Sequence, residues 1–284
     1  MSNDTFDPRQ ASGESAMRGS RPLELNEVSL NGDGQAKEIA PGKFERKGGY
    51  FRKRILVGKP KDQKPEEIDL GKKAVVVFLK VRRRLIERGR EGEIIRSTGE
   101  HNAPTDAVTL YEGATKEKRN GVAADLRKEF PNLRTVQTVY SLLCEEKSEP
   151  ELVRLIVKGA SLKSDVKAPD VPDFYQYISS FTGQDHFYEY KTVLTPVLEE
   201  GKQTYFAINF QRGEKLDEKR YAYALEQMRK VDENCKDIDQ QRAQRIVKDT
   251  VAPSETTERG EEEATEDVID YPKDDIGPED IPFN

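Results

Sequence analysis

The chain has 284 residues, of which 35% are hydrophobic and 35% are charged, and its net charge is −6. So polar a composition predicts one modest hydrophobic core, a large solvent-exposed surface and disordered ends. No run of 18 apolar residues occurs, so we expect no membrane span and no membrane partner. Two cysteines that are far apart in sequence, and an amino-terminus without signal-peptide character, predict a cytoplasmic protein with reduced thiols.

Acidic and basic residues are concentrated in different segments of the chain, and this distribution is more informative than the net charge. Residues 254–284 hold 12 acidic and 2 basic residues, whereas residues 42–96 hold 18 basic and 8 acidic residues. A basic segment on the body and an acidic tail predict a surface that binds a polyanion, together with an internal competitor for that surface.

The first part of the chain predicts a disordered start followed by strands. Residues 1–22 lack hydrophobic periodicity and are expected to be disordered, and residues 23–250 are expected to form a single domain. Alternation over residues 23–30 predicts a strand, and residues 44–57 predict a second strand region that Gly48 and Gly49 interrupt. Alternation there places Tyr50, Arg52 and Arg54 on one face. Residues 59–69 are expected to form a polar loop.

A central strand is predicted at residues 74–79, where the chain is β-branched and apolar. If the strand continues, Val75, Val77, Leu79 and Val81 point to the core. Single-stranded nucleic acid needs an aromatic ring that stacks on a base and cations that follow the phosphates. The residues assigned to this role on and just before the strand are Lys72, Lys73, Phe78, Lys80, Arg82 and Arg84. The alternative is a core strand in which Phe78 is buried and the cations run into solvent.

The remaining elements alternate between short strands and helices. Short strands are expected at residues 93–96, 106–111, 135–144 and 152–157, with a helix at residues 122–130. A second helix is expected at residues 173–183, with Asp173 as its cap. A hairpin of residues 187–197 and 204–210 makes Tyr188 and Tyr190 candidate surface aromatics for DNA. The longest predicted helix covers residues 217–249, and residues 251–284 are expected to form a disordered acidic tail.

Catalytic motifs are absent from the sequence. The two histidines, His101 and His186, have no zinc-ligand spacing with the cysteines, and there is no phosphate-binding glycine motif or nucleophile elbow. Carboxylates in or near predicted elements are better explained as helix caps or surface acids than as metal ligands; they are Asp106, Asp125, Asp173 and Glu189. We therefore expect no cofactor, no metal and no enzymatic activity.

The end of the acidic tail combines carboxylates with apolar residues. Asp280-Ile281-Pro282-Phe283 follows an acidic stretch that Gly277-Pro278-Glu279 interrupts, and Asn284 comes after the phenylalanine. This segment resembles the acidic tip of bacterial and phage single-stranded DNA-binding proteins. The resemblance implies that the tip recruits replication, recombination and repair proteins, with Asp280, Ile281, Pro282 and Phe283 as the partner-binding residues. No motif of that family is found in the body.

These features together favour a non-catalytic single-stranded DNA-binding protein that acts in replication, recombination or repair. The expected fold class is α+β and β-rich, with a barrel of the oligonucleotide-binding (OB) type decorated by helices. The alternative is a DNA-processing enzyme or annealing mediator, such as a metal-dependent nuclease or a recombinase accessory protein. A virion or scaffold protein is a third reading. The sequence leaves a homo-oligomer open, and a phage origin would place the protein in the host cytoplasm.

Overall fold

The computed structural model describes residues 23–33, 36–40, 43–46, 48–58, 63–89, 93–145, 148–163, 171–182, 185–200 and 204–251. The two predicted tails, and with them the tip residues 280–283, lie outside the described residues. In the described part, no helix is both long and apolar enough to cross a membrane.

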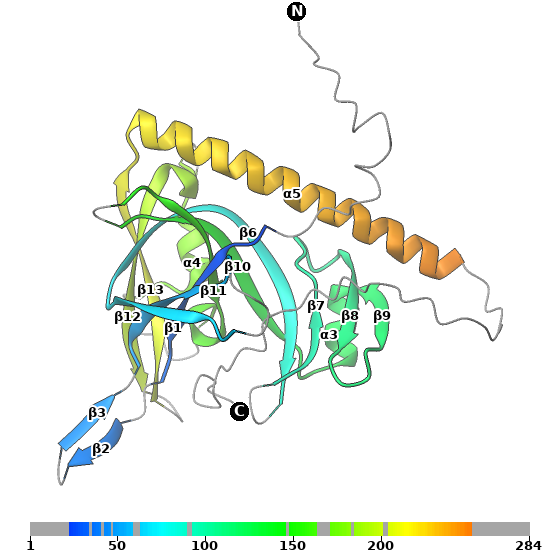
Figure 1. Cartoon of the computed structure of the whole chain (residues 1–284), viewed down its shortest axis with the longest axis horizontal. Helices are drawn as coiled ribbons and strands as arrows, with labels where there is room; N and C mark the ends of the chain where they lie inside the picture. The colour runs from blue at the N-terminus through cyan, green and yellow to red at the C-terminus, as the bar shows by residue number, and fades with distance from the viewer. Residues whose placement is uncertain are drawn as a thin grey trace, which may run out of the picture.

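The first half of the described chain is built almost entirely from strands (Figure 1). They are β1 (Asn26–Asn31), β2 (Ala36–Ala40), β3 (Lys43–Arg46), β4 (Tyr50–Ile55), β5 (Glu66–Gly71), β6 (Ala74–Arg88), β7 (Ile94–Thr98), β8 (Ala107–Glu112) and β9 (Lys118–Val122). The second half adds the helices. It contains α3 (Ala123–Glu129), β10 (Arg134–Leu143), β11 (Glu151–Val157), η1 (Gly159–Ser161), α4 (Phe174–Ser179), η2 (Phe187–Glu189), β12 (Tyr190–Glu200), β13 (Thr204–Lys215) and α5 (Glu218–Val251).

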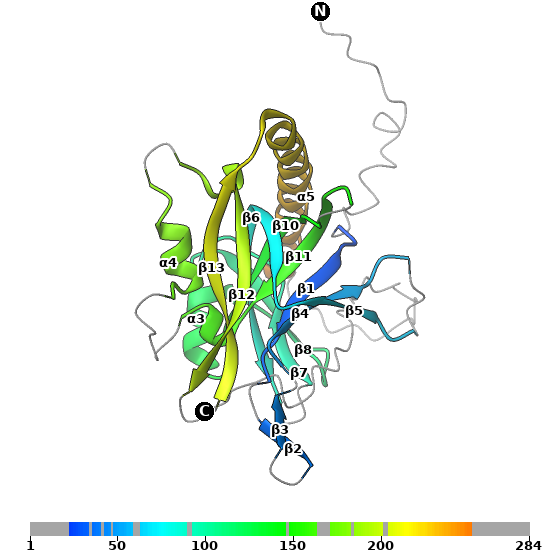
Figure 2. The same cartoon turned by 90° about the vertical axis from the view of Figure 1, so that its left-hand side faces the viewer.

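One mixed sheet of 11 strands organises the described residues. Its order is β5-β4-β1-β11-β10-β6-β7-β8-β9, while β12 pairs with β6 and with β13. Strand β1 runs parallel to β11, and the other described pairs are antiparallel. Strands β2 and β3 form a separate hairpin that projects from one end of the molecule (Figures 1 and 2). The fold is therefore α+β and β-rich, as predicted, with an open sheet rather than a closed barrel.

The main core lies on one face of this sheet and is rich in aromatic rings. Phe78 of β6 is fully buried there, with ring centroids 6.1 Å from Phe174, 6.0 Å from Tyr177 and 6.4 Å from Phe210. Phe174 and Tyr177 come from α4, which lies beside β13 in Figure 2. Tilted and edge-on contacts of this kind add to the hydrophobic stabilisation of the buried rings.

Helix α5 covers the opposite face of the sheet and crosses β6 and β10 along the top of Figure 1. Its residue Ala224 packs with Val77, Leu79 and Leu142, and Val231 and Cys235 pack with Tyr140. These contacts give the sheet a second, smaller apolar layer. The described residues therefore form three layers, with α4 on one side of β6 and α5 on the other.

The prediction that Phe78 shares a face with Lys80, Arg82 and Arg84 is wrong. Phe78 pairs with Ser141 and Lys80 pairs with Tyr140, so Leu79 is an extra residue in β6. A β-bulge of this kind interrupts the simple alternation of faces. Phe78 therefore points into the aromatic core, whereas Lys80 and Arg82 point to the α5 side. Phe78 cannot stack on a base in this structure.

Strand β2 was missed from the sequence, and so were two strands of the large sheet. Strand β5 occupies part of the segment predicted as a loop at residues 59–69, and β9 had no predicted counterpart. Both are polar end strands of the sheet, and their residues are mostly exposed. Hydrophobic alternation is weak in such strands because neither face is deeply buried.

Candidate nucleic-acid interface

Cations from several strands meet on the α5 side of the sheet. Residues that pair directly across strands share a face. The pairs Lys80–Tyr140, Tyr140–Arg154, Arg154–Glu27 and Glu27–Arg54 therefore form one continuous row across β6, β10, β11, β1 and β4. At about 4.8 Å per strand, the row spans roughly 19 Å.

Alternation along β4 and β6 adds three more cations to the same side. Arg52 lies two residues before Arg54, and Arg82 and Arg84 follow Lys80 at two-residue steps. We call this set the basic face; it consists of Arg52, Arg54, Lys80, Arg82, Arg84 and Arg154. The carboxylates of Glu27, Glu67 and Asp69 share this side of the sheet. Six cations against three acids leave the sheet surface positive before α5 is counted.

Carboxylates hold most of these cations in place. Arg54 Nε donates to Glu67 at 2.8 Å, and Arg52 Nη1 donates to the same carboxylate at 3.3 Å. Arg54 and Arg82 are 3% and 2% exposed, and arginines this buried require ion partners. Helix α5 supplies two of those partners, because Lys80 pairs with Asp232 and Arg82 pairs with Asp239.

Arg154 differs from its neighbours on the basic face. Within the part of the chain that the structure describes, no carboxylate lies within ion-pair distance of its guanidinium. Its buried Nε, like that of Arg82, has no hydrogen-bond partner among the described residues. Arg154 is partly exposed and sits in the middle of the row. A guanidinium with unused donors in such a place is suited to bind a phosphate.

Arg154 was missed from the sequence, although its signal was present. It alternates with Val153 and Leu155, which are buried in the core, so a predicted strand at residues 152–157 already placed it on the opposite face. The parallel pairing of β11 with β1 could not be predicted, and this pairing places Arg154 between the cations of β4 and those of β6.

The remaining predicted DNA-binding residues are dispersed. Tyr50 begins β4 and shares the face of Arg52 and Arg54, as predicted, but it is half-buried at the end of the strand beside Asn31. Lys72 and Lys73 are exposed in the turn between β5 and β6. Tyr188 is stacked on His186 with centroids 5.0 Å apart, and the Tyr190 hydroxyl donates to Asp185. Tyr188 lies in η2 and Tyr190 begins β12, so neither belongs to the row that crosses the sheet. The predicted aromatic platform is therefore not assembled.

The only aromatic side chain within the row is Tyr140, and α5 covers it. It is 3% exposed, and its hydroxyl donates to Glu100 at 2.8 Å. Burial and the nearby charge of Glu100 raise the pKa of Tyr140 well above its usual value. In this arrangement Tyr140 packs against α5 and is not available to stack on a base.

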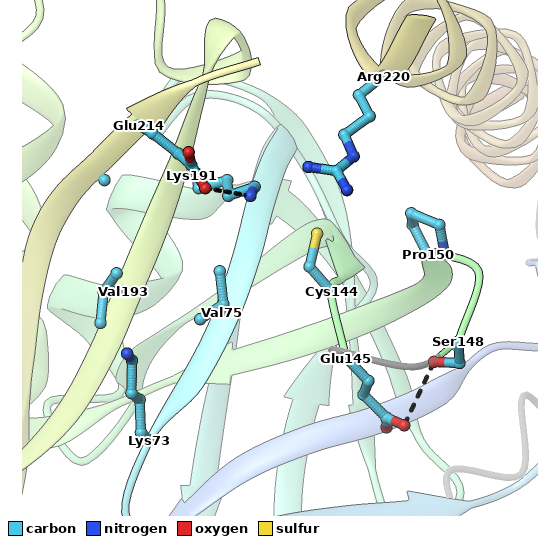
Figure 3. Close-up of a pocket in the computed structure, with 11 residues that line it drawn as sticks. Lys73, Val75, Cys144, Glu145, Ser148, Pro150, Lys191, Val193, Glu214 and Arg220 are labelled. Atoms are coloured by element: carbon cyan, nitrogen blue, oxygen red, sulfur yellow. Dashed lines mark hydrogen bonds and ion pairs between the residues drawn. The ribbon is translucent and has the colours of Figure 1, made fainter. Parts of the chain in front are cut away.

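A cavity of about 310 Å³ lies next to the start of α5 (Figure 3). Val75, Val193 and Cys144 line it, and Lys73 and Arg220 extend toward it from separate elements. Burial raises the pKa of the Cys144 thiol, which keeps it in the less nucleophilic protonated form. The Cys144 thiol is therefore not an activated nucleophile.

The carboxylates considered for metal binding have structural contacts instead. Asp106 accepts hydrogen bonds from the backbone N–H groups of Asn102 and Ala103, Asp125 pairs with Lys128, and Glu189 pairs with Lys215. Asp173 caps α4, as predicted, in a capping box with Gln176. Among the residues that the structure describes, no group of three or more His, Cys, Asp or Glu side chains could hold a metal ion.

Comparison of the chain with models of protein families, with curated proteins and with solved structures gives no match. The case for a function therefore depends on the basic face and on the sequence of the tail.

Proposed function

We propose that the protein is a non-catalytic single-stranded DNA-binding protein with little sequence preference, and that the basic face is its binding surface. The observation that carries this proposal is the row across five strands that holds the cations Lys80, Arg154 and Arg54, with Arg154 at its centre. Phosphates dominate affinity for nucleic acid, and cations that follow a groove bind them without reading bases.

The order of five strands supports this proposal. In an OB fold the first strand pairs with the second and the fourth, and a helix commonly lies between the third and the fourth. Here β6 pairs with β10 and with β12, β11 follows β10, and α4 lies between β11 and β12. We infer that β6, β10, β11, β12 and β13 are an OB-type unit to which β1, β4 and β5 were added.

This assignment would place the basic face where OB folds bind oligonucleotides. Oligonucleotides bind OB folds across the second and third strands and the loops beside them. The equivalent strands here would be β10 and β11, which carry Tyr140 and Arg154 on the α5 side. The long connection from β6 to β10, which contains β7, β8, β9 and α3, would then form one wall of the groove.

The tail completes the proposal. Its acidic tip, Asp280-Ile281-Pro282-Phe283, would recruit replication, recombination and repair proteins in the cytoplasm of a bacterium or of a phage host. Its 12 carboxylates would compete with DNA for the basic face. These roles come from the resemblance of the tip and from its charge.

Fluorescence anisotropy with labelled oligo-dT and with a duplex, each with and without magnesium, tests the function. We expect tight, salt-sensitive binding that prefers the single strand and no cleavage in magnesium. Cleavage that requires magnesium would instead support a nuclease. No binding of either DNA at low salt would remove the proposal.

Two variants test the location of the site. Arg154→Gln should weaken oligo-dT binding about tenfold or more, because hydrogen bonds to charged groups contribute about 1.5–3 kcal/mol. It should also lower the slope of log affinity against log salt by about 0.7, the value for one phosphate contact on a single strand. The matched control is Arg229→Gln on the exposed side of α5, where the side chain is 72% exposed. Equal effects of the two variants would move the site away from β11.

A further inference from the structure

Two kinds of contact hold α5 on the sheet. Its first half packs through Ala224, Val231 and Cys235 on apolar side chains of β6 and β10. Of the α5 side chains whose burial is described, Cys235 is the last buried one. We call Lys236–Val251 the distal half of α5. The charged pair of Asp239 and Arg82 joins the distal half to β6.

Asp239 occupies a site that is built for an anion. Its carboxylate accepts hydrogen bonds from Arg82 Nη1 at 2.8 Å and from Arg82 Nη2 at 2.7 Å. Arg242 Nη1 lies 3.4 Å and Asn102 Nδ2 lies 3.5 Å from the same carboxylate. Arg82 and Asn102 approach these oxygens from outside α5, whereas Arg242 belongs to the distal half of α5 itself. The planar fork of an arginine side chain matches the oxygen positions of a carboxylate and of a phosphate, so it can bind either group through two hydrogen bonds.

The site has more donor capacity than Asp239 uses. The side chain of Arg82 is 1% exposed, and its buried Nε has no hydrogen-bond partner among the described residues. Burial acts to lower the pKa of Arg82, but the hydrogen bonds and charge of Asp239 outweigh it and leave that pKa raised. A phosphate offers more acceptor oxygens than a carboxylate, so it can satisfy a donor that Asp239 leaves unused.

Charged groups of both signs surround the site. His101 lies beside it, paired through its backbone with Arg83. Burial lowers the pKa of His101, and the charges of Arg242 and Arg83 lower it further. Asp106 is the acid that opposes this effect. Glu100, whose charge acts on Arg82, is a second acid near the site.

We propose that the Arg82 site is a phosphate site of the basic face that Asp239 fills in the free protein, and that the DNA backbone displaces the distal half of α5. This inference rests on the proposed function and names the regulation of the same surface. The first half of α5 stays on its apolar contacts, while the distal half exchanges its carboxylate for a phosphate. A DNA phosphate and the carboxylate of Asp239 then compete for the guanidinium of Arg82.

The variant Asp239→Asn tests the exchange by removing the competing charge while keeping the size of the side chain. Its matched control is Glu233→Gln, which removes one charge from an exposed position of α5 that pairs with Arg229. In anisotropy titrations with oligo-dT, Asp239→Asn should bind more tightly than the control by about 5- to 150-fold, the usual range of coupling between sites. Equal affinity of the two variants would overturn the inference while leaving the DNA function intact.

A second measurement uses the unchanged protein, because Asp239→Asn also leaves Arg82 without its partner. Hydrogen exchange of backbone amides is followed with and without saturating oligo-dT. Faster exchange in residues 236–251, with no change in residues 218–235, is expected. Unchanged or slower exchange in the distal half would overturn the inference. If neither the unchanged protein nor Asp239→Asn binds oligo-dT, the proposed function falls as well.

Discussion

His101 is a buried histidine that the fold keeps neutral. It is 1% exposed, and its ring Nδ1 lies 3.1 Å from the Gly99 carbonyl oxygen, which assigns the proton of the neutral ring to Nδ1. Burial is the main reason that the pKa of His101 is lowered, and the charges of Arg242 and Arg83 act in the same direction. The pH at which His101 takes up a proton therefore reports on the region near Arg242, in the distal half of α5.

We predict that this residue makes the protein less stable as the pH falls below about 6.5, the ordinary pKa of histidine. The unfolded chain takes up a proton there while the folded chain does not, so the free energy of unfolding decreases from pH 7 to pH 5. In urea titrations at several pH values, His101→Gln should flatten this slope. His186→Gln, at the other histidine, is the control, and an equally flat slope in that variant would contradict the assignment.

Leu79 shows why the prediction of which side chains share a face of the sheet was only partly correct. Alternation correctly placed Arg52 and Arg54 on one face of β4, and Lys80, Arg82 and Arg84 on one face of β6. It could not reveal the extra residue in β6, because a bulge depends on the register with β10 rather than on the composition of β6. Phe78 was therefore assigned to the wrong face.

At the scale of elements, the short helix α4 depends on its cap and on the core. Asp173 accepts a hydrogen bond from the Gln176 backbone N–H at 2.9 Å, and Phe174 and Tyr177 follow it into the aromatic cluster. A helix of six residues is too short to be stable alone. The cap and the two rings therefore have to act together.

We predict that Asp173→Ala lowers the free energy of unfolding by about 1 kcal/mol, the usual cost of a lost helix cap. Asp173→Asn should cost only a few tenths of that, because asparagine caps helices about as well as aspartate. Urea denaturation followed by circular dichroism measures both values. If the two variants lose equal stability, the charge of Asp173 rather than its cap hydrogen bond is the source of the effect.

Elements with a buried face were predicted from the sequence, and those without one were not. The strands at β10 and β11, the helix at α3 and the hairpin of β12 and β13 were found from hydrophobic pattern and turn residues. Strands β5 and β9 were missed because they are polar. The contacts of α5 could not be predicted from the sequence either. Asp232 and Asp239 pair with Lys80 and Arg82 only because α5 packs on β6.

At the scale of the whole molecule, charge of opposite sign is placed in separate parts of the chain. The basic face collects its cations from residues 52–154, and the acidic residues of the tail follow Ser254. Under the proposed function, two sources of carboxylate would compete with DNA. Asp239 lies close to Arg82, whereas the tail would act through its total charge and its concentration near the body.

We predict that deletion of residues 254–284 tightens oligo-dT binding at low salt, and that the gain shrinks as salt is added, because competition between a charged tail and DNA is screened. A full-length variant in which the 12 tail carboxylates are changed to amides separates charge from length. Both variants should bind alike in anisotropy titrations. If the deletion tightens binding and the amide variant does not, the tail acts by occupying space. If neither does, the tail does not compete with DNA, and Asp239 is left as the internal competitor.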